Sequence, residues 1–383
     1  MIDIKNTFVR LTSRRYPHGT EDLAMDVVKE ILPDIKFEQD EFGNYYYLLP
    51  KSDGEYSDSM FTSHLDTINS APYSHVTKTI WSAEEKKMVP NPAYEEKEDD
   101  MSIKHVFDDD FIKTDGNTNL GADDKAGTTI LMNMISENVP GLYYFFVGEE
   151  SGCIGSSALS KVWDKAGFPV INRCVSFDRR GYDSIITSQG GVTASNEFAT
   201  ELSNRLNEYG FWYKPDPTGI YTDSAEFTYV IPECTNISVG YFSEHTKTER
   251  QDIEFLTYLA VVCAKGVEWD TLPTIKQKNS VYNGKISYGS RYSSGYGTGS
   301  SYRSNQTPYY GYGEYGSWYD DWYERSYPTS STKKEDELPF NDKGVKNNTE
   351  DKFVQPTIDE MDFDTWYEEQ KRKNWDKDES LVY

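Results

Sequence analysis

Two adjacent acids, Glu149 and Glu150, follow the unbroken apolar run LYYFFV at residues 142–147. A run of this length is typical of a strand buried on both faces of a sheet, so the acids are predicted to lie at the carboxyl end of a strand. Paired carboxylates in that place can divide two tasks, because one can move protons as a general base while the other binds a cation. Singly, each acid is better explained as a solvated surface charge.

His64 and Asp66 supply a second pair, in the motif SHLDT that follows a predicted strand over residues 60–63. Side chains two residues apart on a strand point to the same face, so Asp66 is expected to orient the imidazole while His64 binds a metal ion. A histidine close to an aspartate is more often structural, so this motif needs further ligands.

Three further candidates lie in predicted turns: Asp123 in GADDKAG, Asp178 in SFDRRG and His245 in SEHTKTE. Each has an ordinary alternative, as a helix cap, a turn residue or a surface histidine. Together with the pairs above they form a nitrogen and oxygen ligand set without cysteine, which suits zinc, cobalt or manganese. A bridging carboxylate holds two metals about 3.5 to 4 Å apart and leaves another carboxylate free as general base, so the count fits two metal ions.

These candidates have to be positioned by regular elements, which the rest of the sequence predicts. Helical spacing of apolar residues, such as Leu23, Val27, Val28 and Ile31, predicts helices over residues 20–35, 196–207, 223–230 and 251–267. Strands are predicted over residues 44–49, 60–63, 142–147, 173–177 and 236–239. This alternation through the first 270 residues predicts an α/β fold, a three-layer α/β/α sandwich around a mixed, mostly parallel sheet.

In order and in local motifs, the sequence resembles the co-catalytic di-zinc exopeptidases, the superfamily of peptidase T, the glutamate carboxypeptidases and the single-domain leucyl aminopeptidases. The resemblance covers roughly the first 270 residues, through YPHGTED, SHLDT, TDGNTNLGADDKAG, FFVGEESGCIG, SFDRRG, GIYTDSAEF and GYFSEHT. It implies that His64 and Asp178 hold one metal ion and that Glu150 and His245 hold the other. Asp123 would bridge the two ions, and its peptide bond to Asp124 is often cis in this superfamily.

The same resemblance implies a mechanism and a substrate class. Glu149 would be the free base that takes a proton from water and returns it to the leaving amine, while Asp66 orients His64. The implied activity is that of an aminopeptidase or dipeptidase on a peptide or small amide substrate. A deacylase of the same chemistry, or a binding scaffold on a retired hydrolase fold, are the alternatives.

One departure from the superfamily concerns the lid domain that several members carry between the ligands corresponding to Asp178 and His245. The interval here is too short for a lid, which leaves the substrate side chain open; the segment 70–110 is expected to cover the site instead. Arg179 and Arg180 are weighed as partners of a substrate acid or of surface acids. Four flanking residues are left out of the predicted site: Thr222, Asp223, Tyr241 and Ser243.

Composition excludes several other classes. The chain has 39 Lys and Arg residues against 64 Asp and Glu residues, a formal net charge of -25, which opposes binding to nucleic-acid phosphates. Four scattered cysteines fit a reducing compartment, and no segment is apolar enough for a signal peptide or a membrane span. We therefore expect a cytoplasmic protein without nucleic-acid or membrane partners.

The composition changes beyond residue 275 to a Tyr, Gly and Ser-rich segment that is followed by an acidic stretch. Such a sequence lacks the aliphatic residues that build a core. Residues 1–275 are thus predicted to form the catalytic domain and residues 276–383 a disordered tail. The end of the tail near Trp366 is the predicted docking segment for a protein partner.

Overall fold

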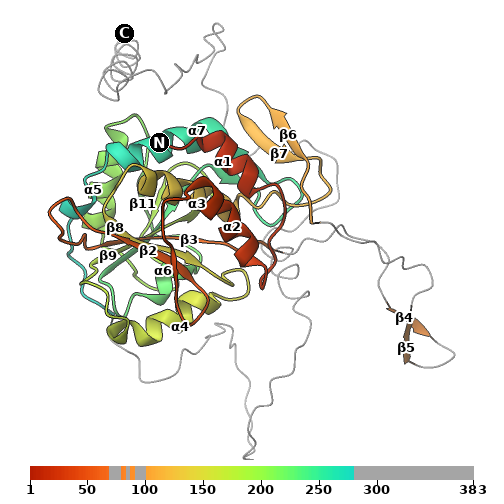
Figure 1. Ribbon diagram of the computed structural model, residues 1–383, viewed down its shortest axis with the longest axis horizontal. Coiled ribbons are helices and arrows are strands. Elements are labelled where there is room, and N and C mark those ends of the chain that lie inside the picture. Colours follow the sequence, from red (N-terminus) through yellow and green to blue (C-terminus); the bar gives the residue numbers. More distant parts are fainter. Residues whose placement is uncertain (69–78, 83–86, 91–100, 280–383) are drawn as a thin grey trace, which may run out of the picture. The chain divides into compact units, whose positions relative to one another are not determined.

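A mixed sheet of eight strands forms the centre of the protein in the computed structural model, which describes residues 1–68, 79–82, 87–90 and 101–279 (Figure 1). The strand order is β1-β2-β8-β3-β9-β12-β10-β11, and the four central strands β8, β3, β9 and β12 run parallel to one another. The strand bounds are β1 (Glu38–Gln39), β2 (Tyr45–Leu49), β3 (Ser59–His64), β8 (Gly141–Phe146), β9 (Arg173–Arg179), β10 (Ser184–Ile186), β11 (Lys214–Asp216) and β12 (Glu233–Ser238).

Helices cover both faces of this sheet, so the predicted three-layer α/β fold is confirmed. In Figure 1, α1, α3 and α7 lie on one side of the strands and α4 and α6 on the other. The helix bounds are α1 (Ile4–Leu11), α2 (Glu21–Ile31), α3 (Ala122–Ser136), α4 (Ile154–Val162), α5 (Asn196–Asn207), α6 (Asp223–Glu226) and α7 (Ile253–Lys265), with one-turn 3₁₀ helices at Trp163–Lys165 and Trp269–Thr271. No helix among the described residues is both long and apolar enough to span a bilayer.

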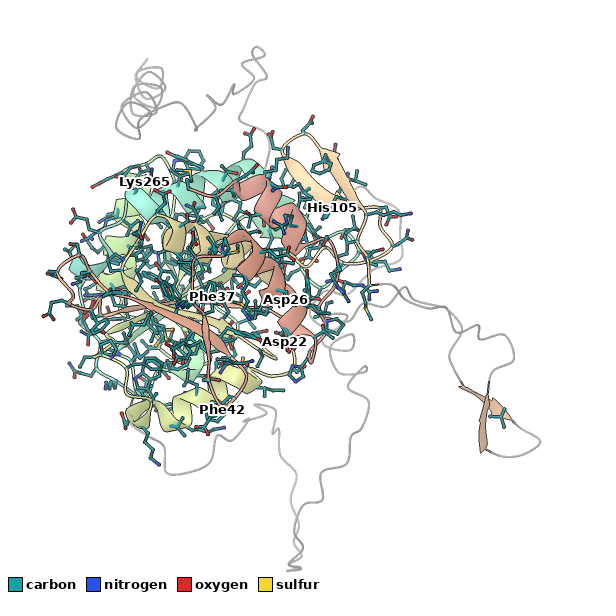
Figure 2. The ribbon with its side chains drawn as sticks, in the orientation of Figure 1. Asp22, Asp26, Phe37, Phe42, His105 and Lys265 are labelled. Carbon is teal, nitrogen blue, oxygen red and sulfur yellow. The ribbon has the colours of Figure 1, made fainter. Side chains whose placement is uncertain are left out.

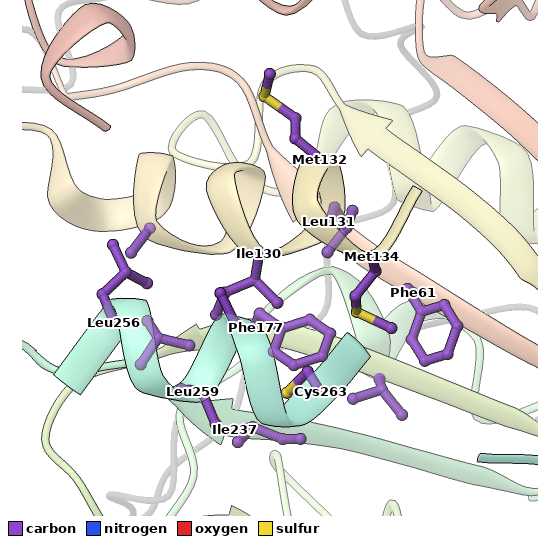
Figure 3. Packing of buried hydrophobic residues seen from close by; sticks show 14 of the residues in the cluster. Phe61, Ile130, Leu131, Met132, Met134, Phe177, Ile237, Leu256, Leu259 and Cys263 are labelled. Carbon is purple, nitrogen blue, oxygen red and sulfur yellow. The ribbon is translucent and has the colours of Figure 1, made fainter. Parts of the chain in front are cut away.

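The central strands are apolar on both faces because both faces are covered. On β3, Phe61 faces the larger core and Met60 the smaller one, and both side chains are fully buried. Burying a side chain of this size stabilises the fold by roughly 1.5 to 3 kcal/mol. Figure 3 shows the larger core, where side chains of α3 and α7 meet those of the sheet: Ile130, Met134, Leu256, Leu259, Cys263, Phe61 and Phe177.

The predicted helix after residue 20 forms as α2, but its buried face differs from the predicted one. Ala24, Met25 and Val28 are buried, whereas Leu23 is 40% exposed. The apolar residues of this helix form two overlapping stripes that share Val28, and the small side chain of Ala24 lies on the stripe that packs. Asp22, labelled in Figure 2, accepts a hydrogen bond of 2.6 Å from the Tyr45 hydroxyl of β2, which ties α2 to the sheet.

A second, four-stranded antiparallel sheet was not anticipated from the sequence. Its order is β13-β14-β7-β6, with β6 (His105–Asp108), β7 (Phe111–Thr114), β13 (Tyr241–Phe242) and β14 (Arg250–Asp252). The strands β4 (Thr79–Ser82) and β5 (Lys87–Pro90) form a separate antiparallel pair. Most of the segment 70–110 and nearly all of the predicted tail fall outside the described residues, as do the expectations attached to them. The predicted helix 223–230 is shorter in the structure, where α6 ends at Glu226.

Candidate metal centre

The candidate residues gather at the edge where the parallel strands end. His64 is the last residue of β3, Asp178 lies one residue before the end of β9, and Glu149 follows β8 by three residues. Since β8, β3 and β9 are parallel neighbours, their carboxyl ends lie at one edge of the sheet. The topology therefore brings together acids and a histidine that are 29 to 114 residues apart in sequence.

Asp123 lies between the two histidines. His64 Nε2 is 3.0 Å from Asp123 Oδ1, and His245 Nε2 is 3.2 Å from Asp123 Oδ2. Each imidazole also faces a second acid, because His64 Nε2 is 3.7 Å from Asp178 Oδ1 and His245 Nε2 is 2.9 Å from Glu150 Oε1. The five side chains thus form two groups that share one carboxylate.

This arrangement fits a pair of divalent cations. Ligand atoms of His64, Asp123 and Glu150 lie within 4.8 Å of one another, and the donors are imidazole nitrogens and carboxylate oxygens, the ligands that zinc takes in catalytic sites. Asp124 is close to His64 and Asp178 as well, but its carboxylate accepts the backbone amides of His64 and Gly127. The peptide bond between Asp123 and Asp124 is cis.

Burial and close charges shift the pKa values of these groups. Burial raises the pKa of Glu150, and burial followed by the charge of Asp123 raises that of Asp178. Burial lowers the pKa of His64, but its hydrogen bonds to Asp123 and Asp178 outweigh burial and raise the pKa well above its ordinary value. The pKa of His245 is raised in the same way, because Glu150 and Asp123 outweigh burial. The site therefore concentrates carboxylates that favour cations.

Glu149 differs from its neighbour Glu150 in what it contacts. Among the described residues, its carboxylate contacts the thiol of Cys153, with Cys153 Sγ 3.7 Å from Glu149 Oε1, while Glu150 meets His245. Burial, reinforced by the charge of Asp178, raises the pKa of Glu149 well above its ordinary value. The two acids thus occupy different positions, one in the ligand cluster and one beside it.

Asp66 is close to His64, but the two residues do not share a strand face. Strand β3 ends at His64, so Asp66 does not share a strand face with it, and His64 Nδ1 lies 3.1 Å from the backbone oxygen of Asp66 and 3.5 Å from its carboxylate. The carboxylate accepts the backbone amides of Glu149 (3.0 Å) and Glu150 (3.1 Å). Asp66 therefore fixes the loop that carries both glutamates.

Two solved structures share this architecture. The aminopeptidase PepT from Bacillus cereus matches with a TM-score of 0.53 and 17% identity over 68% of this chain and 96% of that chain. PhTET1-12s, solved as a dodecamer, matches with a TM-score of 0.51 and 15% identity over 69% of this chain and 98% of that chain. The chain has the fold of these two proteins. The fold implied by the resemblance to di-zinc exopeptidases is thereby confirmed.

Sequence comparison adds less. No family model matches the chain. A curated relative, the uncharacterized protein YqjE of Bacillus subtilis (strain 168), is 46% identical over 66 residues, which cover 15% of this chain and 18% of that protein. The match therefore spans about a fifth of the length of this relative and leaves the activity open.

Three residues outside the predicted site contact Asp178 directly. Thr222 Oγ1 donates to Asp178 Oδ2 at 2.6 Å, and the Tyr241 hydroxyl donates to Asp178 Oδ1 at 3.1 Å. Asn236 Oδ1 accepts a hydrogen bond from the backbone amide of Asp178, and Asn236 Nδ2 donates one to the Asp178 carbonyl. Thr222 lies just before a helix and Tyr241 just past a strand, positions that turn and cap residues share, whereas Asn236 lies inside β12.

Arg179 and Arg180, weighed as partners of a substrate acid, are engaged within the chain. Arg180 Nη1 lies 3.0 Å from Glu244 Oε1, and Arg179 Nη2 lies 3.4 Å from the Thr218 carbonyl and 3.9 Å from Asp216. These contacts favour the reading in which both arginines pair with acids of the protein.

Proposed function

We propose that this chain is a metal-dependent exopeptidase, an aminopeptidase or dipeptidase that hydrolyses peptide bonds. The observation that carries the proposal is the position of Asp123, which meets His64 through one oxygen and His245 through the other. A carboxylate in that position is suited to bridge two cations, and the acid Glu149 lies beside the cluster without joining it. The shared fold with PepT, which is named an aminopeptidase, supports the proposal.

The cofactors would be two divalent cations, zinc with cobalt or manganese as alternatives. His64 and Asp178 would hold one of them, Glu150 and His245 the other, and Asp123 both. Bound there, they would act as Lewis acids toward the scissile carbonyl and acidify the attacking water.

The protein's own residues would then carry the proton. Glu149 would take a proton from the attacking water and deliver it to the leaving amine. Asp66 would hold Glu149 in place, since its carboxylate accepts the Glu149 amide at 3.0 Å. Thr222 and Tyr241 would fix the orientation of Asp178 through their hydroxyls.

Specificity follows from what stands between Asp178 and His245. In the structure this interval forms β10, α5, β11, α6 and β12, which pack into or against the main sheet, and β13, which pairs with β14 in the second sheet. We infer that this interval contributes no lid over the site.

Metal analysis combined with a substrate panel tests the proposal. The full chain should contain two zinc ions and hydrolyse aminoacyl or dipeptide substrates, and a chelator should abolish that turnover. A preference for N-acyl substrates would indicate that the activity is that of a deacylase and not of a peptidase. A protein that neither binds zinc nor hydrolyses any member of the panel would indicate a binding scaffold.

A further inference from the structure

A buried carboxylate outside the ligand set lies against the chain that leads to Asp123. Glu249 is 1% exposed, and its Oε2 accepts the backbone amides of Leu120 at 2.7 Å and Gly121 at 2.9 Å. Its Oε1 accepts the amide of Asp123 itself at 3.1 Å. Hydrogen bonds from amides to a carboxylate are charge-assisted and among the stronger ones in proteins.

Glu249 belongs to the same short loop as His245. The loop connects β13 and β14, which pair with each other, and β14 pairs in turn with β7, the strand that precedes Asp123 in the chain. Within the loop, the amide of Glu249 donates to the carbonyl of Thr246 at 3.3 Å. One loop therefore carries both His245 and Glu249, the carboxylate that accepts the amides of the Asp123 segment.

The Asp123 segment also passes close to Thr67. Gly121 has a φ of +73°, and a Cβ placed there would lie 2.9 Å from Cγ2 of Thr67. Gly121 therefore packs closely against Thr67, while its backbone amide is held by Glu249. A shift of the Glu249 side chain would allow this segment to move relative to His245.

We propose that Glu249 is a positioning residue that couples the two halves of the metal centre. By fixing the Asp123 segment on the His245 loop, it sets the separation of His245 Nε2 and Asp123 Oδ2, which is 3.2 Å. Loss of its hydrogen bonds lowers the affinity for the cation held by His245, Glu150 and Asp123. The affinity for the cation held by His64 and Asp178 falls less. This inference rests on the proposed function, because it requires a centre with two cations.

The chain offers a matched control. Glu233 is also a fully buried glutamate that accepts three backbone amides, from Ser195, Ile275 and Lys276 at 2.7 to 2.8 Å. It is the first residue of β12, at the opposite end of that strand from the metal centre. Glu233→Gln therefore removes a buried carboxylate that holds backbone amides in the same way, at a place away from the predicted metal ligands.

The experiment measures zinc binding to the full, metal-stripped chain by equilibrium dialysis and calorimetry. We compare the wild type with Glu249→Gln and Glu233→Gln, and with the shortened acid Glu249→Asp as a second variant in case the amide impairs folding. Outer-shell substitutions typically lower metal affinity about 10- to 100-fold. The expected result is such a loss for the second zinc ion in both Glu249 variants, with the first ion changed by less than about threefold.

A double-substitution experiment locates the effect. In the background of His245→Ala, which is designed to remove the second ion, Glu249→Gln should change the affinity of the remaining zinc ion by less than about threefold. Wild-type binding of both ions by the Glu249 variants would overturn the inference, and so would an equal loss in Glu233→Gln. A wild-type chain that binds fewer than two zinc ions would instead overturn the proposed function.

Discussion

The hydroxyl of Thr222 donates a 2.6 Å hydrogen bond to Asp178, a residue 44 positions earlier in the chain. The second oxygen of Asp178 accepts the Tyr241 hydroxyl, so both oxygens of this carboxylate are held by neutral donors. Neutral donors fix the orientation of an acid without cancelling its charge. A ligand for a cation requires both properties.

We expect Thr222→Val to weaken metal binding, because it removes the hydroxyl while keeping the shape of the side chain. The affinity for the ion at His64 and Asp178 should fall about 10- to 100-fold, as is usual for outer-shell losses. Zinc titration of the metal-stripped protein measures the effect. Thr222→Ser retains the hydroxyl and should bind as the wild type does; equal losses in both variants would contradict the assigned role.

The division of work between the two adjacent glutamates gives a second prediction. Glu149→Gln should lower kcat by about 10²- to 10⁴-fold, the usual contribution of a general base, and retain both metal ions. Glu150→Gln should instead lower the metal content. Both are measured by steady-state kinetics and metal analysis of the same preparations. Near-normal turnover by Glu149→Gln would rule out its role as the base.

Asp123 should be required for both ions, since it contacts both histidines. Asp123→Asn should weaken zinc binding by more than about 100-fold, because even outer-shell changes cost about 10- to 100-fold. Asp115→Asn is the control, because Asp115 is an exposed acid that bonds to Asn117 in the segment leading to the site. Retention of two tightly bound ions by Asp123→Asn would be incompatible with a bridging position.

How far the sequence predicted this site depended on the range of the contacts. The acids after β8 and β9 were found because buried parallel strands carry a local apolar signal and share one carboxyl edge. Asp66 was selected on a strand geometry that the structure does not have, since β3 ends at His64. The hydrogen bond from the Asp123 amide to Glu249 joins residues 126 positions apart. A contact over that distance leaves no periodic pattern in the sequence, so no local motif could indicate it.

Removal of the metal ions should lower thermal stability. A ligand present at 100 times its dissociation constant stabilises the folded state by about 2.7 kcal/mol. For a domain of this size that corresponds to a melting temperature roughly 5 to 10 °C higher for each ion. Calorimetry with zinc and with chelator measures the difference, and His245→Ala should show about half of it. Identical melting temperatures in zinc and in chelator would exclude a stably bound metal centre.

The last described residues of the chain give the last prediction. The amides of Ile275 and Lys276 donate to the buried Glu233, and the amide of Asn279 donates to the carbonyl of Thr228 at 2.8 Å. A chain shortened to residues 1–279 keeps these bonds and should retain kcat/KM within about twofold, because the ligand set lies within it. A chain ending at residue 272 leaves the Glu233 carboxylate without two donors, which costs about 1 to 3 kcal/mol. Urea unfolding of both truncations, with peptide hydrolysis by each, separates the outcomes. Loss of hydrolysis on removal of residues 280–383 alone would assign the tail a part in the reaction.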